Sequence, residues 1–268
     1  MNNKVAFNII TVTLNAKEEL EKTIKSIQSQ SYKNFIHIIK DGLSNDKTNC
    51  IDFLKYKNTK FYGSKDAGVY DAMNQGFKFC ENEYVIFLNA GDIFFSSNTL
   101  EDLAKNIRKY PGFSSYSGVT LQINIDEKKV KRCIGLGNLY RTIPLAQLPH
   151  PSFVIKKSIL SNLSRPFDSS LKISADYKLQ LFLRKKNLWK NCYLNQIVSL
   201  MPIGGISTSS KKSIINGYKE TFLFSYKLYN LTSIYIIFIK LFLNIYSRIK
   251  IKKLKELNIL LDSLFQQI

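Results

Sequence analysis

Four short apolar runs in the first half of the chain each end in a polar or glycine-containing break, and helix-like segments separate them. The runs cover residues 7–14, 35–39, 60–63 and 83–88. Runs of this length and composition are typical of buried strands, and strands that alternate with helices predict an α/β fold with a parallel sheet. Ligands bind at the carboxyl edge of such sheets, so Asn15, Asp41, Asp66 and Asp92 are expected to converge on one edge.

The break after the fourth run reads Asn89-Ala90-Gly91-Asp92. A carboxylate just past a central strand can hold a divalent cation against a diphosphate. Asp92 could instead cap a helix expected over 97–110, because Asp is a favoured N-cap residue. The local sequence leaves both roles open.

The second half carries fewer strand-like and helix-like segments. Strands are expected over 113–125, 129–134 and 197–201, and a helix over 174–185. Beyond Ser213 the chain becomes a long apolar helix candidate. We therefore expect a catalytic domain over 1–212, divided at 112/113 into two halves, and a helical tail over 213–268.

The helices expected in the first half follow the same periodicity rules. Asn15 can cap a helix whose apolar positions have helical spacing, and a further helix is expected over 70–79. The apolar positions of the first helix are Leu20, Thr23, Ile24 and Ile27.

The formal net charge of +19 on 268 residues indicates polyanionic partners: nucleic acid, an anionic membrane or phosphate-bearing substrates. Much of the excess lies in the tail, where residues 207–257 include ten basic and two acidic side chains. Four separated cysteines, at 50, 80, 133 and 192, form no metal-binding pattern and fit reduced thiols. The N-terminus has no secretory signal pattern, so a cytoplasmic location is expected.

The apolar segment 231–246 is shorter than the roughly 20 residues of a bilayer span and carries Lys240 in its middle. On a helix it would present a narrow polar stripe beside a broad apolar surface, which favours a helix lying in the membrane interface. The stripe consists of Ser233, Lys240, Asn244, Ser247 and Arg248. The alternative is a helix packed against the catalytic domain or a second subunit.

Three segments carry a resemblance to a known family. Residues 66–76 read Asp-Ala-Gly-Val-Tyr-Asp-Ala-Met-Asn-Gln-Gly, and residues 41–48 read Asp-Gly-Leu-Ser-Asn-Asp-Lys-Thr. Together with 89–92, they resemble the nucleotide-sugar half of a family 2, GT-A fold glycosyltransferase. The resemblance covers about residues 5–207, and it departs from the usual Asp-x-Asp metal motif because Asn89 replaces the first carboxylate.

The resemblance implies roles for the residues of the first half. Asp41 and Asp66 would bind the nucleotide, and Asp92 would hold Mn²⁺ or Mg²⁺ on the diphosphate. Asn15 would help enclose the nucleotide, while Asp71, Asn74 and Asn89 would line the donor side. As structural alternatives, 41–48 is an ordinary turn with a helix cap, and Tyr70, Ala72 and Met73 are helix-packing residues only.

In the second half, Asp176 matches the position of the general base in the same family. Its alternative is a first-turn Asp that the helix N-terminus stabilises. His150, between two prolines, would touch donor phosphates or acceptor unless it is structural. Ser207 or Lys211 would reach phosphate from a loop that begins Gly204-Gly205, for which a plain turn is the alternative.

These expectations combine into an inverting, metal-dependent hexosyltransferase. The donor would be UDP-glucose or UDP-galactose, and the acceptor a saccharide linked to undecaprenyl diphosphate in O-antigen, lipopolysaccharide or capsule assembly. Peripheral attachment to an anionic membrane surface, at the cytoplasmic face of the inner membrane, would follow.

Three other functions are compatible with parts of this sequence. A nucleotidyltransferase would need a basic Gly-rich loop after the first strand, and 15–18 is not one. A basic membrane- or nucleic-acid-binding module on an inactive transferase-like fold is the main alternative, although acidic strand ends argue against nucleic acid. An inactive relative would explain the missing first carboxylate.

Overall fold

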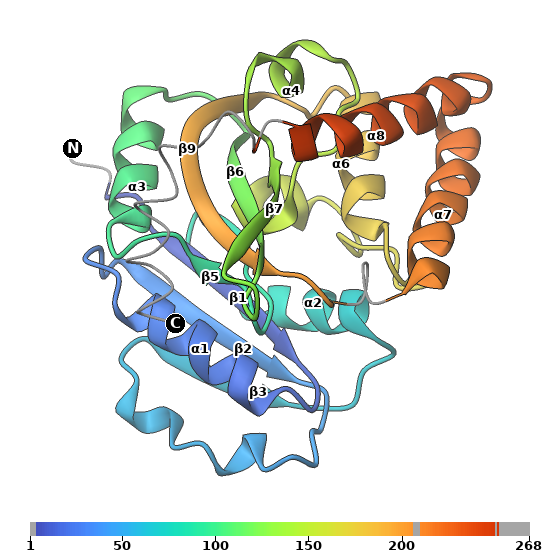
Figure 1. Cartoon of the computed structure of the whole chain (residues 1–268). Coiled ribbons are helices and arrows are strands. Elements are labelled where there is room, and N and C mark those ends of the chain that lie inside the picture. The colour runs from blue at the N-terminus through green and yellow to red at the C-terminus, as the bar shows by residue number, and fades with distance from the viewer. Residues whose placement is uncertain (1–3, 206–209, 250, 252–268) are drawn as a thin grey trace.

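The computed structural model describes residues 4–205, 210–249 and 251 (Figure 1). One half of its sheet is parallel, in the strand order β3-β2-β1-β4. These strands are β1 (Phe7–Thr13), β2 (Phe35–Asp41), β3 (Thr59–Gly63) and β4 (Tyr84–Phe87). The register pairs Thr13 with Asp41 and Asp41 with Gly63, so the carboxyl ends of three strands are level. The predicted α/β sheet with a shared carboxyl edge is therefore confirmed.

The other half of the sheet is mixed. From β4 it continues through β8 (Phe153–Lys156), β6 (Ser115–Asn124), β9 (Asn191–Pro202) and β5 (Ile93–Phe94), and β7 (Lys129–Ile134) pairs with β6. Strand β9 begins six residues before the predicted strand 197–201, because it runs parallel to β6 along most of the length of that strand.

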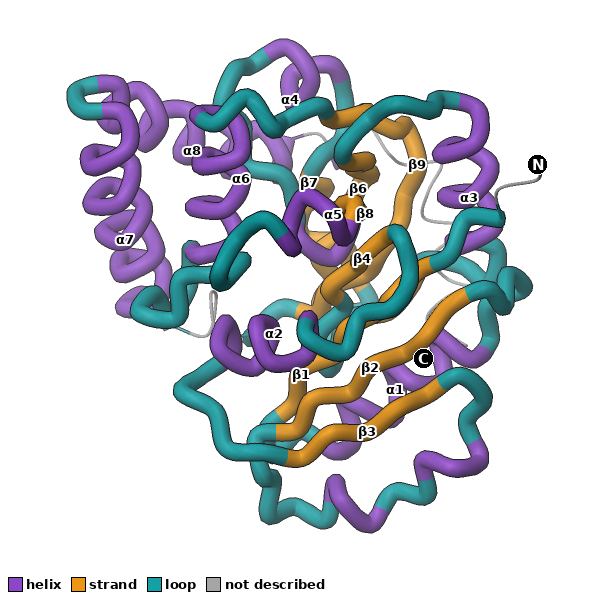
Figure 2. The backbone as a smooth tube through the Cα atoms, turned by 180° about the vertical axis from the view of Figure 1, so that it is seen from behind, coloured by secondary structure: helices purple, strands orange, loops and turns teal. Residues whose placement is uncertain are grey.

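Helices cover both faces of the sheet (Figures 1 and 2). On one face, α1 (Lys17–Gln28) and α3 (Thr99–Lys109) contribute to a single apolar cluster. On the other face, α2 (Val69–Phe77) packs with α6 (Ala175–Lys185). The short helices are η1 (Thr48–Cys50), η2 (Phe53–Lys55), α4 (Asn138–Thr142), η3 (His150–Ser152) and α5 (Lys157–Ser161).

Two predicted helix caps are absent. The N-cap of α1 is Ala16, which makes no side-chain cap bond, and Asn15 lies outside the helix with φ 51°. Its side chain instead accepts a hydrogen bond from the backbone N–H of Asn45 (2.8 Å). The N-cap of α3 is Asn98, so Asp92 does not cap that helix and the structural alternative for Asp92 is wrong.

The predicted single helix beyond Ser213 is a hairpin of two helices, α7 (Lys211–Tyr229) and α8 (Thr232–Ile249). The chain turns at Asn230, whose positive φ of 51° is a backbone conformation that Asn tolerates better than most residues. Helix α7 packs against α6, and α8 packs against β7. The hairpin is therefore part of the wall around the carboxyl edge of the sheet.

Helix α8 has an outer apolar face and an inner face on which polar side chains lie beside buried Ile236, Ile239 and Leu243. Ser233 and Ser247 are buried, and Lys240 and Asn244 are half-buried against the protein, whereas Arg248 is exposed. The outer face consists of exposed apolar side chains: Ile234, Tyr235, Phe238, Leu241, Phe242, Ile245 and Ile249. The predicted polar stripe exists, but most of it faces the protein rather than water.

Candidate active site

A cleft of about 1340 Å³ lies at the carboxyl edge of the sheet. Its walls come from the strand-end loops, from the first turn of α6, from β7 and from the inner faces of α7 and α8. Asp66, Asn89, Asp92, His150 and Asp176 all line it. The cleft therefore joins the two predicted halves and the helical hairpin in one site.

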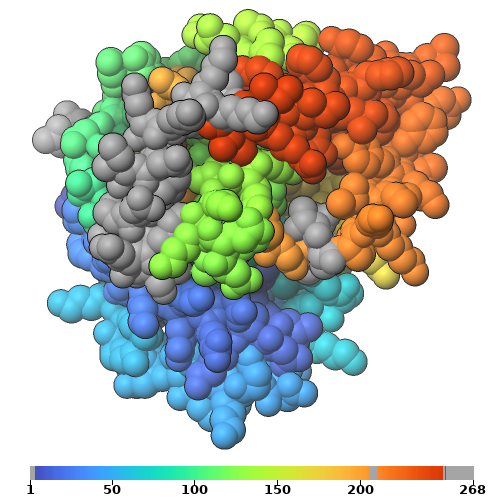
Figure 3. All heavy atoms as spheres, in the orientation of Figure 1, coloured from blue at the N-terminus to red at the C-terminus, as the bar shows by residue number. Residues whose placement is uncertain are grey.

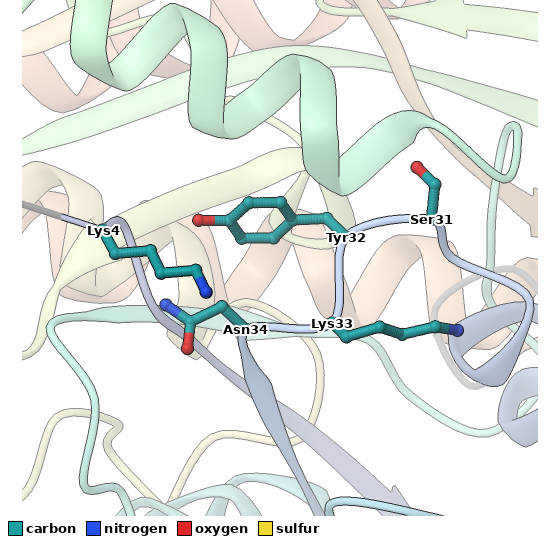
Figure 4. Close-up of a pocket in the computed structure, with 5 residues that line it drawn as sticks. All are labelled: Lys4, Ser31, Tyr32, Lys33 and Asn34. Carbon is teal, nitrogen blue, oxygen red and sulfur yellow. The ribbon is translucent and has the colours of Figure 1, made fainter. Parts of the chain in front are cut away.

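A second pocket, of about 320 Å³, lies at the amino ends of β1 and β2 (Figure 4). Its lining residues are Lys4, Ser31, Tyr32, Lys33 and Asn34, with no acidic side chain among them. It is far smaller and lacks the acid–base groups of the cleft, so we take the cleft as the functional site.

A buried lysine holds two strand-end loops together. Lys40, at the end of β2, is fully buried and donates to the carbonyls of Asp41 (2.7 Å) and Ser64 (2.6 Å). It also forms an ion pair with Asp66 (3.1 Å). Asp66 lines the cleft, whereas Asp41 does not and accepts from the backbone and hydroxyl of Ser44. A Cβ on Gly42 would lie 2.8 Å from the Asp66 carboxylate, so this approach requires glycine.

Asp71 and Asn74 lie outside the cleft lining and bind the protein itself. Asp71 accepts from the backbone of Ala67 and the side chain of Gln75. Asn74 donates to the carbonyl of Phe167 (2.8 Å) and accepts from its N–H (2.9 Å). These bonds fix α2 against the segment before α6, and donor binding by either side chain stays a prediction.

Asp92 is a buried carboxylate between β4 and β5. Burial raises its pKa to about 8, because the ionised form loses its hydration there. Beside it, Asn89 Oδ1 is buried and has no partner among the described residues. Two such oxygens suit a hard divalent cation. In the described part of the chain no group of three His, Cys, Asp or Glu side chains could hold a metal, so phosphate or water oxygens would have to complete the shell.

Asp176 lies in the first turn of α6. The Tyr70 hydroxyl donates to the carbonyl of Ile173 (2.6 Å) and lies 3.3 Å from one carboxylate oxygen of Asp176, and Gln147 Nε2 lies 3.5 Å from the other. Tyr70 therefore contributes more than packing to this site. Burial raises the pKa of the Tyr70 phenol, with the Asp176 charge as a further cause.

The segment before Asp176 is held by the helical hairpin. Glu220, on α7, accepts hydrogen bonds from the backbone N–H groups of residues 172, 173 and 174 at 2.8, 3.0 and 3.0 Å. Removing the hairpin would therefore also disturb the position of Asp176.

His150, in η3, lies between the two carboxylates. Its Nε2 is 3.9 Å from Asp92 Oδ2, and its Nδ1 is 4.0 Å from Asp176 Oδ2. Asn89 Nδ2 lies 3.2 Å from Nε2, while Nδ1 is on the side of Asp176. Burial lowers the pKa of His150, and the Asp176 charge partly opposes this.

Sequence reasoning missed several residues of the site. Lys40, Gln147, Glu220 and Arg132 were not singled out, and Lys240 was assigned to the polar side of an interfacial helix. Lys40 and Lys240 each interrupt an apolar run, and such a position indicates a buried cation that binds a specific partner. Lys211 is exposed at the start of α7 and does not line the cleft, and Ser207 lies outside the described residues.

Known proteins are similar to this chain in sequence and in fold. The model of the family described as "Glycosyl transferase family 2" matches residues 8–162. The "PGL/p-HBAD biosynthesis glycosyltransferase" of Mycobacterium bovis (strain BCG) is 25% identical over 209 residues, which are 76% of this chain and 79% of that protein.

Two solved structures show a similar fold. S. aureus TarS 1–349 in complex with UDP-GlcNAc has a TM-score of 0.64 at 18% identity, covering 87% of this chain and 70% of that fragment. The mannosyltransferase PcManGT from Pyrobaculum calidifontis, in complex with GDP-Man and Mn²⁺, has a TM-score of 0.62 at 11% identity, covering 90% and 74%. These likenesses agree with the GT-A architecture expected from the sequence.

Proposed function

Since the chain belongs to glycosyl transferase family 2, we propose that its cleft transfers a hexose from a nucleotide sugar to an acceptor hydroxyl with inversion at the anomeric carbon. The observation that carries the proposal is the position of His150, within 4.0 Å of both Asp92 and Asp176. A candidate cation ligand and a candidate base thus lie on two sides of one imidazole. A reaction between a diphosphate ester and a hydroxyl uses both of these groups.

In the proposed reaction Asp176 takes the proton of the acceptor hydroxyl. The oxygen then attacks the anomeric carbon, and the bond from that carbon to the diphosphate breaks with its electron pair leaving on the nucleoside diphosphate. Tyr70 and Gln147 hold the carboxylate of Asp176 in place, and Asp66 contacts the nucleotide. A divalent ion, Mn²⁺ or Mg²⁺, held by Asp92 and Asn89 would neutralise charge on the leaving diphosphate.

The proposed donor is a UDP-hexose, glucose or galactose. The similar structures of TarS and PcManGT hold UDP-GlcNAc and GDP-Man, so the fold accommodates more than one nucleotide. Thermal stabilisation of the purified protein by UDP-, GDP-, dTDP- and CMP-sugars, each with and without Mn²⁺, tests the proposal. A metal-dependent shift with one nucleotide class is expected, and no shift with any sugar nucleotide would refute it.

We further propose that the α7–α8 hairpin lies on an anionic membrane, at the cytoplasmic face of the inner membrane. In the space-filling view the two helices form one orange-to-red surface (Figure 3). On α8 seven apolar side chains are exposed on the outer face, while Lys240 and Asn244 line the cleft, so the helix presents an apolar surface outward. Of the described helices, α8 alone is long and apolar enough for a span, with a mean hydropathy of 1.3. Its packing on β7 and α7 favours lying in the interface.

The hairpin also supports a lipid-linked saccharide, such as one on undecaprenyl diphosphate, as the acceptor in surface polysaccharide assembly. Exposed Lys211, Lys212, Lys219 and Lys227 on α7 would attract anionic head groups.

Co-sedimentation with vesicles of anionic and of neutral lipid tests the membrane proposal. Phe238→Gln removes an outer apolar side chain that is 65% exposed and is expected to weaken binding, whereas Leu54→Gln, 98% exposed on η2, is the matched control. Binding that is equal in all three proteins, or self-association that Phe238→Gln abolishes in place of vesicle binding, would contradict it.

A further inference from the structure

We propose that Arg132, Lys240 and Arg248 form a binding site for the phosphate or diphosphate group of the acceptor, on the inner face of α8. The inference deepens the proposed function, on which it rests, by assigning the acceptor's anionic group to named side chains. All three line the same cleft as Asp176. None of the three has a carboxylate within ion-pair distance in the described part of the chain.

Neutral groups hold two of the cations in position. Lys240 Nζ donates to the Thr221 hydroxyl (2.7 Å) and lies over the rings of Tyr177 and Tyr218, at 5.5 and 5.3 Å from their centroids. Arg132 Nε donates to the Ser247 hydroxyl (3.1 Å). These contacts use one of the three N–H donors of Lys240 and one of the five of Arg132, so further donors remain for an anion.

The electrostatics of the group favour an anionic ligand. The pKa of Lys240 is lowered to about 8, mainly by burial and also by the Arg132 charge, while the Asp176 and Glu220 charges oppose this shift. Burial also lowers the pKa of Arg132, with a contribution from Arg248. The carboxylates that act on Lys240 belong to Asp176 and Glu220, and Glu220 is already bonded to three backbone N–H groups. Holding these cations close together costs hydration free energy, and a phosphate that binds between them offsets this cost.

The position of the group fits a lipid-linked acceptor. Lys240 lies over the ring of Tyr177, the residue that follows Asp176, so a phosphate bound there would be close to the reacting hydroxyl. The opposite face of the same helix carries the exposed apolar side chains. A lipid chain could therefore pass from the inner face of α8 to its outer face, while the donor diphosphate stays beside Asp92.

Binding of farnesyl diphosphate, below its micellar concentration, tests the site by calorimetry on the full chain without nucleotide. Farnesol and inorganic pyrophosphate separate the lipid from the phosphate contribution. We expect farnesyl diphosphate to bind at least about tenfold more tightly than either probe. Arg132→Gln and Lys240→Gln should each weaken it by about tenfold, since a hydrogen bond to a charged group is lost.

Two further variants make the test decisive. Arg248→Gln changes an exposed side chain and should also weaken binding, whereas Lys55→Gln, exposed on η2 outside the cleft, should not. Unchanged affinity in all three cleft variants would overturn the proposal. Pyrophosphate that binds as tightly as farnesyl diphosphate would overturn the lipid assignment.

UDP with Mn²⁺ separates this site from that of the donor. If UDP displaces farnesyl diphosphate, and the cleft variants weaken both equally, the cations belong to the donor site and the inference is wrong. A wild-type protein that binds farnesyl diphosphate but no sugar nucleotide would instead refute the proposed function alone.

Discussion

Replacing Asp92 by Asn is expected to stabilise the metal-free protein at neutral pH. Burial raises the pKa of Asp92 from its ordinary value of 3.8 to about 8. The native state therefore holds this proton more tightly than the unfolded state does, and the free energy of unfolding falls as pH rises through the window from about 4 to about 8. Asn has a similar shape and no charge, so it removes this dependence.

The size of the effect follows from the width of the window. Within the window the free energy of unfolding of the wild type falls by roughly 1.4 kcal/mol per pH unit. The wild type should therefore lose about 3 kcal/mol of stability relative to Asp92→Asn between pH 5 and pH 7. Mn²⁺ with UDP should reverse the order at pH 7, because bound cation replaces the proton in the wild type and has no carboxylate in the variant.

Urea unfolding of EDTA-treated wild type and variant at pH 5, 6 and 7 measures the difference directly. Parallel pH dependence of the two proteins would show that Asp92 does not titrate in this window and would refute the reasoning. A variant that Mn²⁺ with UDP stabilises as much as the wild type would remove Asp92 from the cation site.

Three further predictions concern the base, the close packing of the sheet and the buried lysine. Asp176→Asn should lower kcat by about 10²- to 10⁴-fold with UDP affinity unchanged in calorimetry, and normal turnover would show that another group is the base. In Gly118→Ala the new Cβ would lie 2.5 Å from Val198 Cγ2 and 2.7 Å from the Gln196 carbonyl. We expect a loss of about 1–3 kcal/mol in urea unfolding, against less than about 0.5 kcal/mol for Gly205→Ala, and equal losses would contradict this. Lys40→Met should cost about 3–5 kcal/mol, because it leaves the nearly buried Asp66 without its ion-pair partner, and a near-neutral result by the same assay would show that Asp66 is solvated.

The parallel half of the sheet was predictable from sequence because its strands are short, apolar and bounded by polar breaks. The β1–β4 runs were found to within two residues at every end, and β7 was found at both ends. The length of β9 was not predicted, because its first half pairs with β6 and carries no periodic apolar signal of its own. The hairpin was missed because the turn at Asn230 interrupts two apolar helices without a Gly or Pro.

The sequence by itself determined the parallel strands of the first half, the family of the chain and the identity of its acidic groups. Those properties depend on local patterns of a few residues. Only the tertiary structure brought Asp92, His150 and Asp176 together, and only packing decided that the polar stripe of α8 faces the cleft. The sequence of a helix shows which residues share one face, but it does not show what that face contacts. The surface that α8 contacts is built by residues more than a hundred positions away, as when Arg132 donates to the Ser247 hydroxyl.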